Sequence, residues 1–238
     1  MRNRDGFPTN GLYGFVNMIN KIVAEENPKY MMVAFDIGKT FRHEKYKDYK
    51  GGRRETPEDL KVQFPIAKKI LTAMGIKYLE CEGYEADDII GTISSWCDKD
   101  PEYEALIVSS DKDLLQLISE ETVVKLLKPK DYIMMDEATF IQTYGFEPIK
   151  MIDLKALMGD ASDNIPGVKG IGEKTAIKLL TQYGSLDGIY ENIDNIKGST
   201  HEKLVTGNED AYYSKELVTI YREVPLNITW DDLLYGNE

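Results

Sequence analysis

The sequence predicts an α/β protein in which a mainly parallel, twisted sheet is flanked by helices and followed by a helical part. Up to about residue 135, short apolar runs typical of buried strands alternate with segments of helical periodicity. From residue 136 onward the strand patterns stop and helical patterns continue. The 238 residues, 42% hydrophobic and 29% charged, suffice for one large domain or for a core with a smaller appendage. We therefore expect an α/β core at 1–135 and a helical part at 136–238.

The first elements follow from apolar spacing and from proline. Apolar residues at three- and four-residue steps predict a helix over 12–23, and a continuous apolar run predicts a buried strand at 30–35. The charged stretch 37–56 is expected to be a long loop or a weakly ordered helix. A helix opened by a proline and two acids is expected over 57–75, followed by a short strand at 76–79.

The later elements continue the alternation. A helix is expected to start within 83–88, then a strand at 105–108 and a helix through 114–118. Two further apolar runs, 122–127 and 132–135, flank a polar turn and predict a hairpin. In the helical part, the clearest periodicity predicts a helix from Lys174 to Gln182.

Composition excludes several classes of protein. Two cysteines, Cys81 and Cys97, and two histidines fit neither a disulfide framework nor a zinc site, so a reducing cytoplasm is the expected location. No apolar run is long enough for a membrane span, so no membrane partner is expected. The net charge of −12 argues against nucleic-acid binding driven by overall charge, but it leaves room for a local basic surface.

Acidic residues gather at or just after the predicted strand ends and where the helical part begins. In doubly wound sheets the ligand site lies at the carboxyl ends of the strands. A site with oxygen ligands alone selects hard ions such as Mg²⁺ or Mn²⁺. The sequence therefore predicts a metal site, and its candidate ligands are Asp36, Glu85, Asp87, Asp88, Asp111, Asp113, Asp160 and Asp163.

The spacing of the acids suggests how they would come together. Asp111 and Asp113 would share one side of an extended segment, and Asp160 and Asp163 one side of a helical turn. The alternative is that these acids only cap helices and solvate loops. For any single acid this alternative and a metal-ligand role are equally favoured. For the whole set a metal site is favoured, because acids follow three apolar strands on the expected crevice side.

A basic stretch interrupts this acidic chain. Residues 39–54 carry seven Lys or Arg against two acids, with Phe41, Tyr46 and Tyr49 between them. Such a mixture neutralises phosphates and stacks on nucleobases. A solvated loop that balances nearby acids is the alternative. We favour nucleic-acid binding, because the stretch follows a strand that ends in a candidate metal ligand.

A glycine-rich turn precedes the helix at 174–182. Gly167, Gly170 and Gly172 lie within six residues, accompanied by Lys169 and Lys174. Glycines let a backbone approach a phosphate closely, and a helix N-terminus supplies free N–H groups. Such contacts read no base, so binding would be independent of sequence. A simple turn between two packed helices is the alternative.

Together these motifs resemble the bacterial 5′–3′ exonuclease family, the flap-endonuclease-like domain that also forms the N-terminal part of bacterial DNA polymerase I. The resemblance runs from about Pro8 to Tyr221, with the motifs in order. Its motifs are Phe35-Asp36, Phe41-Arg42, Tyr49-Lys50-Gly51-Gly52-Arg53, Gly83-Tyr84-Glu85-Ala86-Asp87-Asp88, the segment from Asp111 to Gln116 and the segment from Leu157 to Gly172.

The resemblance implies hydrolysis of DNA phosphodiesters at 5′ ends and 5′ flaps in replication and repair, with two divalent cations, Mg²⁺ or Mn²⁺. It implies that Glu85, Asp87, Asp88 and Asp111 hold the metals directly or through water, while Asp36 lines the first ion's site. It assigns Asp113, Asp160 and Asp163 to the second ion. DNA would be the partner of a monomeric enzyme without an organic cofactor.

The resemblance also implies which residues meet DNA. The stretch 37–56 matches the family's arch, where Lys50 and Arg53 would act as catalytic cations on the scissile phosphate. A helix–three-turn–helix element near 160–183 would grip the duplex backbone, in the family often with a bound K⁺. The DNA contacts implied are Arg42, Tyr49 (stacking on a base), Gly167, Lys169, Gly170, Gly172, Lys174 and Thr175.

One departure from the family pattern opens a second hypothesis. Family members begin with a strand that ends in an Asp-Gly-Asn or Asp-Gly-Met motif, whereas residues 1–10 resemble the connector that follows it. On this reading the chain, taken as a stand-alone protein, lacks the first strand and a principal metal ligand. It would then be a catalytically impaired protein that binds DNA structures. A phosphotransferase using Asp111-Lys112-Asp113 alone is a third possibility, but it explains neither basic motif.

Overall fold

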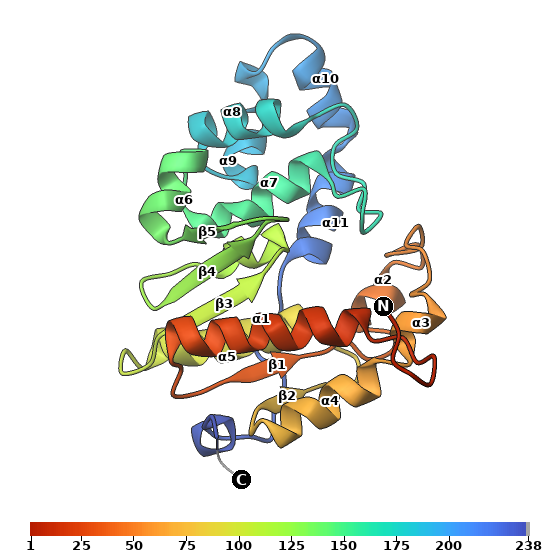
Figure 1. Ribbon diagram of the computed structural model, residues 1–238. Coiled ribbons are helices and arrows are strands. Elements are labelled where there is room, and N and C mark those ends of the chain that lie inside the picture. The colour runs from red at the N-terminus through yellow and green to blue at the C-terminus, as the bar shows by residue number, and fades with distance from the viewer. Residues whose placement is uncertain (237–238) are drawn as a thin grey trace. The chain divides into compact units, whose positions relative to one another are not determined.

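A computed structural model describes residues 1–236 of the chain, which divides into two compact units (Figure 1). The first unit consists of Met1–Gly38, Arg54–Ala86 and the chain from Pro225 onward. The second consists of Lys39–Arg53 and Asp87–Val224, and it holds the larger hydrophobic core. Each unit is described by itself below.

The first unit packs helices on a two-stranded parallel sheet. Strands β1 (Met32–Ala34) and β2 (Lys77–Leu79) pair with Val33 opposite Tyr78. Around them lie helices α1 (Asn10–Glu26), α3 (Glu58–Lys61) and α4 (Phe64–Ala73) and the short 3₁₀ helix η4 (Trp230–Leu233). The core centres on Ile19, Leu71 and Ile76. The helix expected at 57–75 is thus divided in two, because Pro65 has no N–H to continue a helix and instead starts α4.

The second unit contains a three-stranded sheet and the helix before it. Helix α5 (Ala86–Lys99) leads to β3 (Ala105–Ser109), the 3₁₀ helix η1 (Lys112–Leu117), β4 (Thr122–Leu127) and β5 (Tyr132–Met135). Strand β4 is central, parallel to β3 and antiparallel to β5 (Figure 1). The predicted hairpin is therefore confirmed with its expected bounds. Helix α2 (Phe41–Lys45) gives the basic stretch a short ordered segment.

After β5 the described chain contains helices and 3₁₀ turns, as the periodicity predicts. The elements are α6 (Glu137–Tyr144), η2 (Pro148–Lys150), α7 (Met151–Met158), α8 (Glu173–Tyr183), α9 (Leu186–Glu191), η3 (Ile193–Asn195), α10 (Gly198–Thr206) and α11 (Asn208–Val218). Helix α7 is apolar nearly all round, with Met151, Leu154 and Leu157 fully buried, and it forms the centre of this helical part.

The α/β class is confirmed, with the strands distributed over two small sheets, one in each unit. The local expectation for the acids is wrong at two places. Asp113 lies in the 3₁₀ helix η1 and not in an extended segment, because the side chain of Asp111 caps that helix by accepting from the Asp113 N–H. Asp160 and Asp163 lie in a turn closed by backbone pairing of Asp160 with Ile165, and not in a helix.

None of the helices in the described part of the chain combines the length and the apolar character that crossing a membrane requires.

Two glycines hold the loop after α7 against the glycine-rich turn. At Gly167 (φ +59°) an added Cβ would lie 2.2 Å from the backbone nitrogen of Gly159, which itself has a φ of +71°. The Gly167 N–H also donates to the buried hydroxyl of Ser214 at 2.9 Å. Backbone therefore packs on backbone here, and no side chain fits. Gly172 differs, because an added Cβ there meets nothing within 4 Å.

We expect Gly167→Ala to lower the free energy of unfolding by about 2–4 kcal/mol, since it combines a left-handed backbone with a backbone clash. The matched variant Gly172→Ala, with an ordinary φ of −97° and open space, should stay within about 0.5 kcal/mol of the parent. Urea denaturation of the two variants measures this difference. Equal midpoints would contradict the packing described.

Candidate active site

The eight candidate metal ligands are divided between the two units. Asp36 and Glu85 belong to the first, and the second contains Asp87, Asp88, Asp111, Asp113, Asp160 and Asp163. In the first unit, the exposed Asp36 follows β1, and its Oδ1 accepts a hydrogen bond from the backbone N–H of Ala86 at 2.7 Å. Glu85, the residue before Ala86, is buried, with 6% of its surface exposed. Asp36 thus has the capping contact that the sequence left open as an alternative.

In the second unit, a lysine joins two of the acids. The Nζ of Lys155 in α7 lies 2.9 Å from Asp113 Oδ1 and 2.7 Å from Asp160 Oδ2. The other Asp160 oxygen accepts from the backbone N–H and the hydroxyl of Ser162, at 2.8 and 2.6 Å. Asp111 adjoins this group in the chain, capping η1 through a 2.9 Å bond from Asp113 N–H. The structure therefore gathers acids that lie nearly fifty positions apart in the sequence.

Lys155 was not among the residues predicted from the sequence. Its signal was present, because α7 is apolar apart from this lysine and Asp153, and a buried helix carries a lysine only where a carboxylate pairs with it. The partner Asp113, however, comes from a different element, so sequence periodicity alone does not identify it.

Burial leaves the acid group short of compensating interactions. It raises the pKa of Asp113 to about 6, with Lys155 opposing the shift and Asp111 adding to it. Burial lowers the pKa of Lys155, but Asp113 and Asp160 outweigh that effect and hold it above its ordinary value. Asp113 Oδ1 is buried, and the ion pair with Lys155 Nζ at 2.9 Å offsets its charge.

The candidate ligands have the chemistry that a hard divalent cation takes, because all of them are carboxylates. Asp113 is largely desolvated, and the positive charge beside it comes from Lys155. Within residues 1–236 no three His, Cys, Asp or Glu side chains are arranged as a group that could hold a metal ion. In the second unit, lysine and arginine side chains instead pair with the acids.

Asp163 is paired with the basic stretch. Its side chain is 9% exposed, and Oδ1 accepts from Arg53 Nη2 and, at 3.0 Å, from Arg53 Nε. Its backbone oxygen accepts from the N–H of Lys50, a residue held at a φ of +56°. The two predicted catalytic cations therefore lie on a segment that is fixed to one of the predicted metal ligands.

Two of the predicted DNA contacts lie inside the second unit. Tyr49 is 4% exposed and packs against a small core that includes Ile152 and Leu217, so it offers no free face to a base. Arg42 is 2% exposed, and its guanidinium forms an ion pair with Asp88. The physical reasons are the gain from burying an aromatic ring and the need of a buried carboxylate for a countercharge.

Gly167 is a further predicted DNA contact that is buried, with its N–H donating to Ser214, whereas the other residues of the glycine-rich turn are placed differently. Lys169, Gly172 and Lys174 are exposed where α8 begins, and Thr175 is half-buried. Gly170 has a φ of +84°, and its carbonyl accepts from Lys203 Nζ at 3.2 Å. Of the three glycines, Gly172 thus leaves the most open approach to the helix N-terminus.

Replacing Asp113 by Asn should stabilise the protein in the absence of divalent ions. The folded-state pKa of Asp113, about 6, exceeds the unfolded value near 4, so the folded form keeps its proton up to a higher pH. The free energy of unfolding therefore falls as pH rises from about 4 to about 6, because in that range the unfolded form has lost the proton and the folded form has not. Asn resembles the neutral acid, so the gain should be small below pH 4 and on the order of 2 kcal/mol above pH 6. Urea unfolding in EDTA at pH 5 and pH 8 measures it. A gain that does not grow between these pH values would contradict the assignment.

Two family profiles together cover the chain. The profile described as the 5′–3′ exonuclease N-terminal resolvase-like domain matches residues 1–145, and that described as the 5′–3′ exonuclease C-terminal SAM fold matches residues 146–238. They meet near the change of pattern predicted at 135–136, and that boundary itself stays a prediction.

Curated relatives match nearly the whole chain. DNA polymerase I of Streptococcus pneumoniae strain R6 is 47% identical over 239 residues, which is 99% of this chain and 27% of that protein. DNA polymerase I of Bacillus caldotenax is 46% identical over 242 residues, 100% of this chain and 28% of that protein. The chain therefore spans about a quarter of the length of the curated relatives it matches.

Solved structures share the fold. The bacteriophage T5 D15 protein co-crystallised with metal ions has a TM-score of 0.71 at 24% identity, over 88% of this chain and 81% of that one. The catalytic core of Rad2 in complex with DNA substrate has a TM-score of 0.62 at 19% identity, over 98% and 75%. With family profiles matching from the first residue to the last, the predicted resemblance is confirmed: the chain belongs to the 5′–3′ exonuclease family.

Proposed function

We propose that this chain is a metal-dependent 5′–3′ exonuclease and 5′-flap endonuclease that hydrolyses DNA phosphodiesters in replication and repair. The observation that carries the proposal is the largely buried pair of carboxylates Asp113 and Asp160, which Lys155 bridges and in which burial raises the pKa of Asp113. Family membership supports it, and so do neighbours crystallised with metal ions and with DNA. The proposal describes a cytoplasmic monomer without an organic cofactor.

The metals proposed are two Mg²⁺ or Mn²⁺ ions. Within the second unit the oxygens would come from Asp87, Asp111, Asp113, Asp160 and Asp163. The first unit has its own candidate ligands, Asp36 and Glu85. A divalent cation bound to such a set acts as a Lewis acid that activates water and neutralises charge on a phosphate.

The chain's own cations have separate tasks in this proposal. Lys155 keeps Asp113 and Asp160 close together despite their like charge. Lys50 and Arg53 orient the scissile phosphate and offset the charge that develops on it. Arg53 suits this task because 46% of its side chain is exposed although it contacts Asp163.

DNA backbone would be bound at the start of α8. Lys169, Lys174 and the backbone of Gly172 are exposed there, and a helix N-terminus attracts phosphate. The contacts reach no base edge, so binding would not depend on sequence. We extend the proposal to a K⁺ held by backbone carbonyls of this turn; to use the Gly170 carbonyl, the ion would have to displace the Lys203 Nζ that donates to it at 3.2 Å.

A catalytically impaired protein that binds DNA structures is the second candidate. It is favoured by the ion pairs that join Arg53 to Asp163 and Lys155 to Asp113 and Asp160, since these cations neutralise acids that the nuclease needs for metal. It predicts binding of flap DNA with no cleavage at any Mg²⁺ or Mn²⁺ concentration.

The deciding experiment is cleavage of a labelled 5′-flap duplex with Mg²⁺ or Mn²⁺. The parent chain should cut, and Asp113→Asn and Asp160→Asn should each lower kcat by about 100-fold or more, because each removes charge from the metal site. Asp131→Asn is the matched control, an exposed acid in the turn between β4 and β5, and it should not change the rate. Equal rates in all variants would refute the site, and binding without cleavage by the parent would favour the second candidate.

A specific contact of Arg53 with the scissile phosphate can be distinguished from the effect of losing one positive charge in this stretch. Arg53→Ala should lower kcat on the flap substrate by about 100-fold, the typical loss when a donor to the developing charge is removed. The neighbouring exposed arginine in Arg54→Ala should change kcat by less than about threefold. Single-turnover rates at saturating enzyme measure both variants. Similar losses in the two would indicate that only net charge matters.

A further inference from the structure

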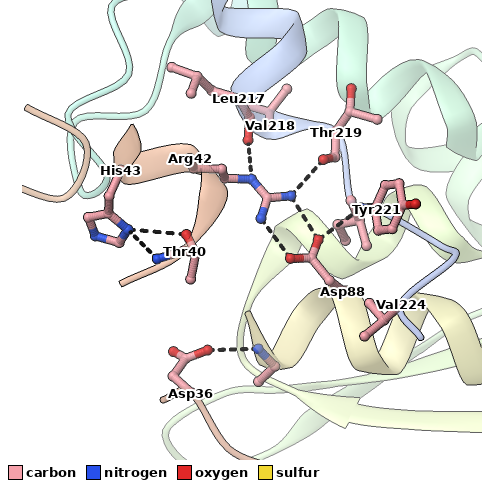
Figure 2. A network of polar contacts seen from close by, with 12 residues as sticks. Asp36, Thr40, Arg42, His43, Asp88, Leu217, Val218, Thr219, Tyr221 and Val224 are labelled. Carbon is pink, nitrogen blue, oxygen red and sulfur yellow. Dashed lines mark hydrogen bonds and ion pairs between the residues drawn. The ribbon is translucent and has the colours of Figure 1, made fainter. Parts of the chain in front are cut away.

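A buried ion pair joins the basic stretch to α5 within the second unit. Arg42 Nη1 donates to Asp88 Oδ2 and Nη2 to Oδ1, both at 2.8 Å (Figure 2). The side chains are 3% and 0% exposed. Two parallel hydrogen bonds fix the relative orientation of a guanidinium and a carboxylate, which a single contact does not.

The same two side chains also bind the segment that follows α11. Arg42 Nε donates to the carbonyl of Leu217 at 2.9 Å and Nη2 to that of Thr219 at 2.7 Å. Asp88 Oδ1 accepts in addition from the backbone N–H of Tyr221 at 2.8 Å. Figure 2 shows Arg42 between Asp88 and these carbonyls. Three segments distant in sequence thus meet at one ion pair.

The segment after α11 is itself firmly placed. The side-chain amide of Gln116 binds this segment twice. Its oxygen accepts from the Ile220 N–H and its nitrogen donates to the Val218 carbonyl, each at 2.9 Å. An added Cβ on Gly91 of α5 would lie 2.6 Å from the Ile220 side chain, so helix and segment are in close contact. Arg42 therefore binds a segment whose own backbone is hydrogen-bonded to Gln116 and packed against α5.

These contacts distinguish Asp88 from Asp87, the residue before it. Both Asp88 oxygens already accept from Arg42, and the residue has no exposed surface. Asp87, at the preceding position, is only half-buried. A direct metal ligand needs a lone pair that faces the ion. Asp88 Oδ1 uses both of its lone pairs on Arg42 and Tyr221, and Oδ2, which accepts from Arg42, has no exposed surface through which an ion could reach it.

From this geometry we infer that Asp88 is a positioning residue and not a metal ligand: through Arg42 it anchors the segment 39–53 that carries Lys50 and Arg53. The inference rests on the proposed function and corrects the ligand role that the family resemblance implied for Asp88. Further contacts extend the anchor along the segment, since Tyr213 Oη donates to the Lys45 carbonyl at 2.9 Å and Lys45 pairs with Glu216. The segment is then held at Asp88 by one end and at Asp163 by the other.

The test compares Asp87→Asn, Asp88→Asn and Asp98→Asn in the full chain. Asp98 is the matched control, an acid of the same helix that pairs with Arg222 at 2.7 Å and does not contact the basic segment. The readouts are Mn²⁺ affinity by calorimetry, the rate of tryptic cleavage within residues 39–53, and kcat and KM on flap DNA.

Asp88→Asn should bind Mn²⁺ within threefold of the parent, expose the segment to trypsin at least tenfold faster and lower kcat at least tenfold with saturating Mn²⁺. Asp87→Asn should weaken Mn²⁺ binding at least tenfold and leave the tryptic rate unchanged. Asp98→Asn should change none of these by more than twofold. A loss of Mn²⁺ affinity in Asp88→Asn as large as in Asp87→Asn, or an unchanged tryptic rate, overturns the inference.

A double variant keeps the test decisive if Asp88→Asn unfolds. Arg42→Met with Asp88→Leu replaces the buried pair by apolar groups of similar size, a change that proteins often tolerate. This double variant should keep the parent's circular dichroism and Mn²⁺ affinity, and its kcat should remain at least tenfold below that of the parent. Normal circular dichroism with lost Mn²⁺ affinity refutes the inference, and so does a restored kcat. If the parent itself cuts no DNA, the proposed function fails, while Mn²⁺ affinity and trypsin still decide the role of Asp88.

Discussion

Carboxylates that share a small, partly dry volume must have positive charge beside them, and the second unit is organised around this requirement. Like charges at short range in a low dielectric repel strongly, and each buried acid also loses its hydration. The chain meets the requirement with its own side chains: Lys155 pairs with Asp113 and Asp160, and arginines pair with Asp88 and Asp163. Arg42 and Asp88, Arg53 and Asp163, and Lys155 and Asp113 come from different segments, so these three pairs also tie segments together.

The ion pairs differ in how far their side chains are exposed to solvent, and this exposure determines whether a further group can reach them. The pair of Arg42 and Asp88 is almost completely buried, so its contacts are internal to the fold. Arg53 has nearly half of its side chain exposed while it contacts Asp163, so its guanidinium remains open to a further anion. A single stretch of sequence thus contains one buried arginine and one that is exposed to solvent. Net charge does not distinguish them, but burial does.

The loop after α7 connects the acid group with the glycine-rich turn. Asp160 pairs by its backbone with Ile165, and seven residues beyond Asp160 the chain returns to pack Gly167 directly on Gly159. The exposed lysines of the turn follow at once. The proposed metal ligand Asp160 and the exposed lysines proposed to bind DNA backbone therefore lie on one short, close-packed segment. A chain with a strongly negative net charge can in this way present positive charge locally.

The amino-acid sequence by itself determined the class of the fold, the bounds of the hairpin strands, the helical character after Met135 and the family, because periodicity and short motifs are local properties. Tertiary structure decided which charges meet. Arg42 lies 46 positions from Asp88 and 175 from Leu217, and no local pattern encodes such a meeting. For the same reason the burial of Tyr49, the role of Lys155 and the distribution of strands over two sheets were not predicted: each depends on packing between segments that are distant in the chain.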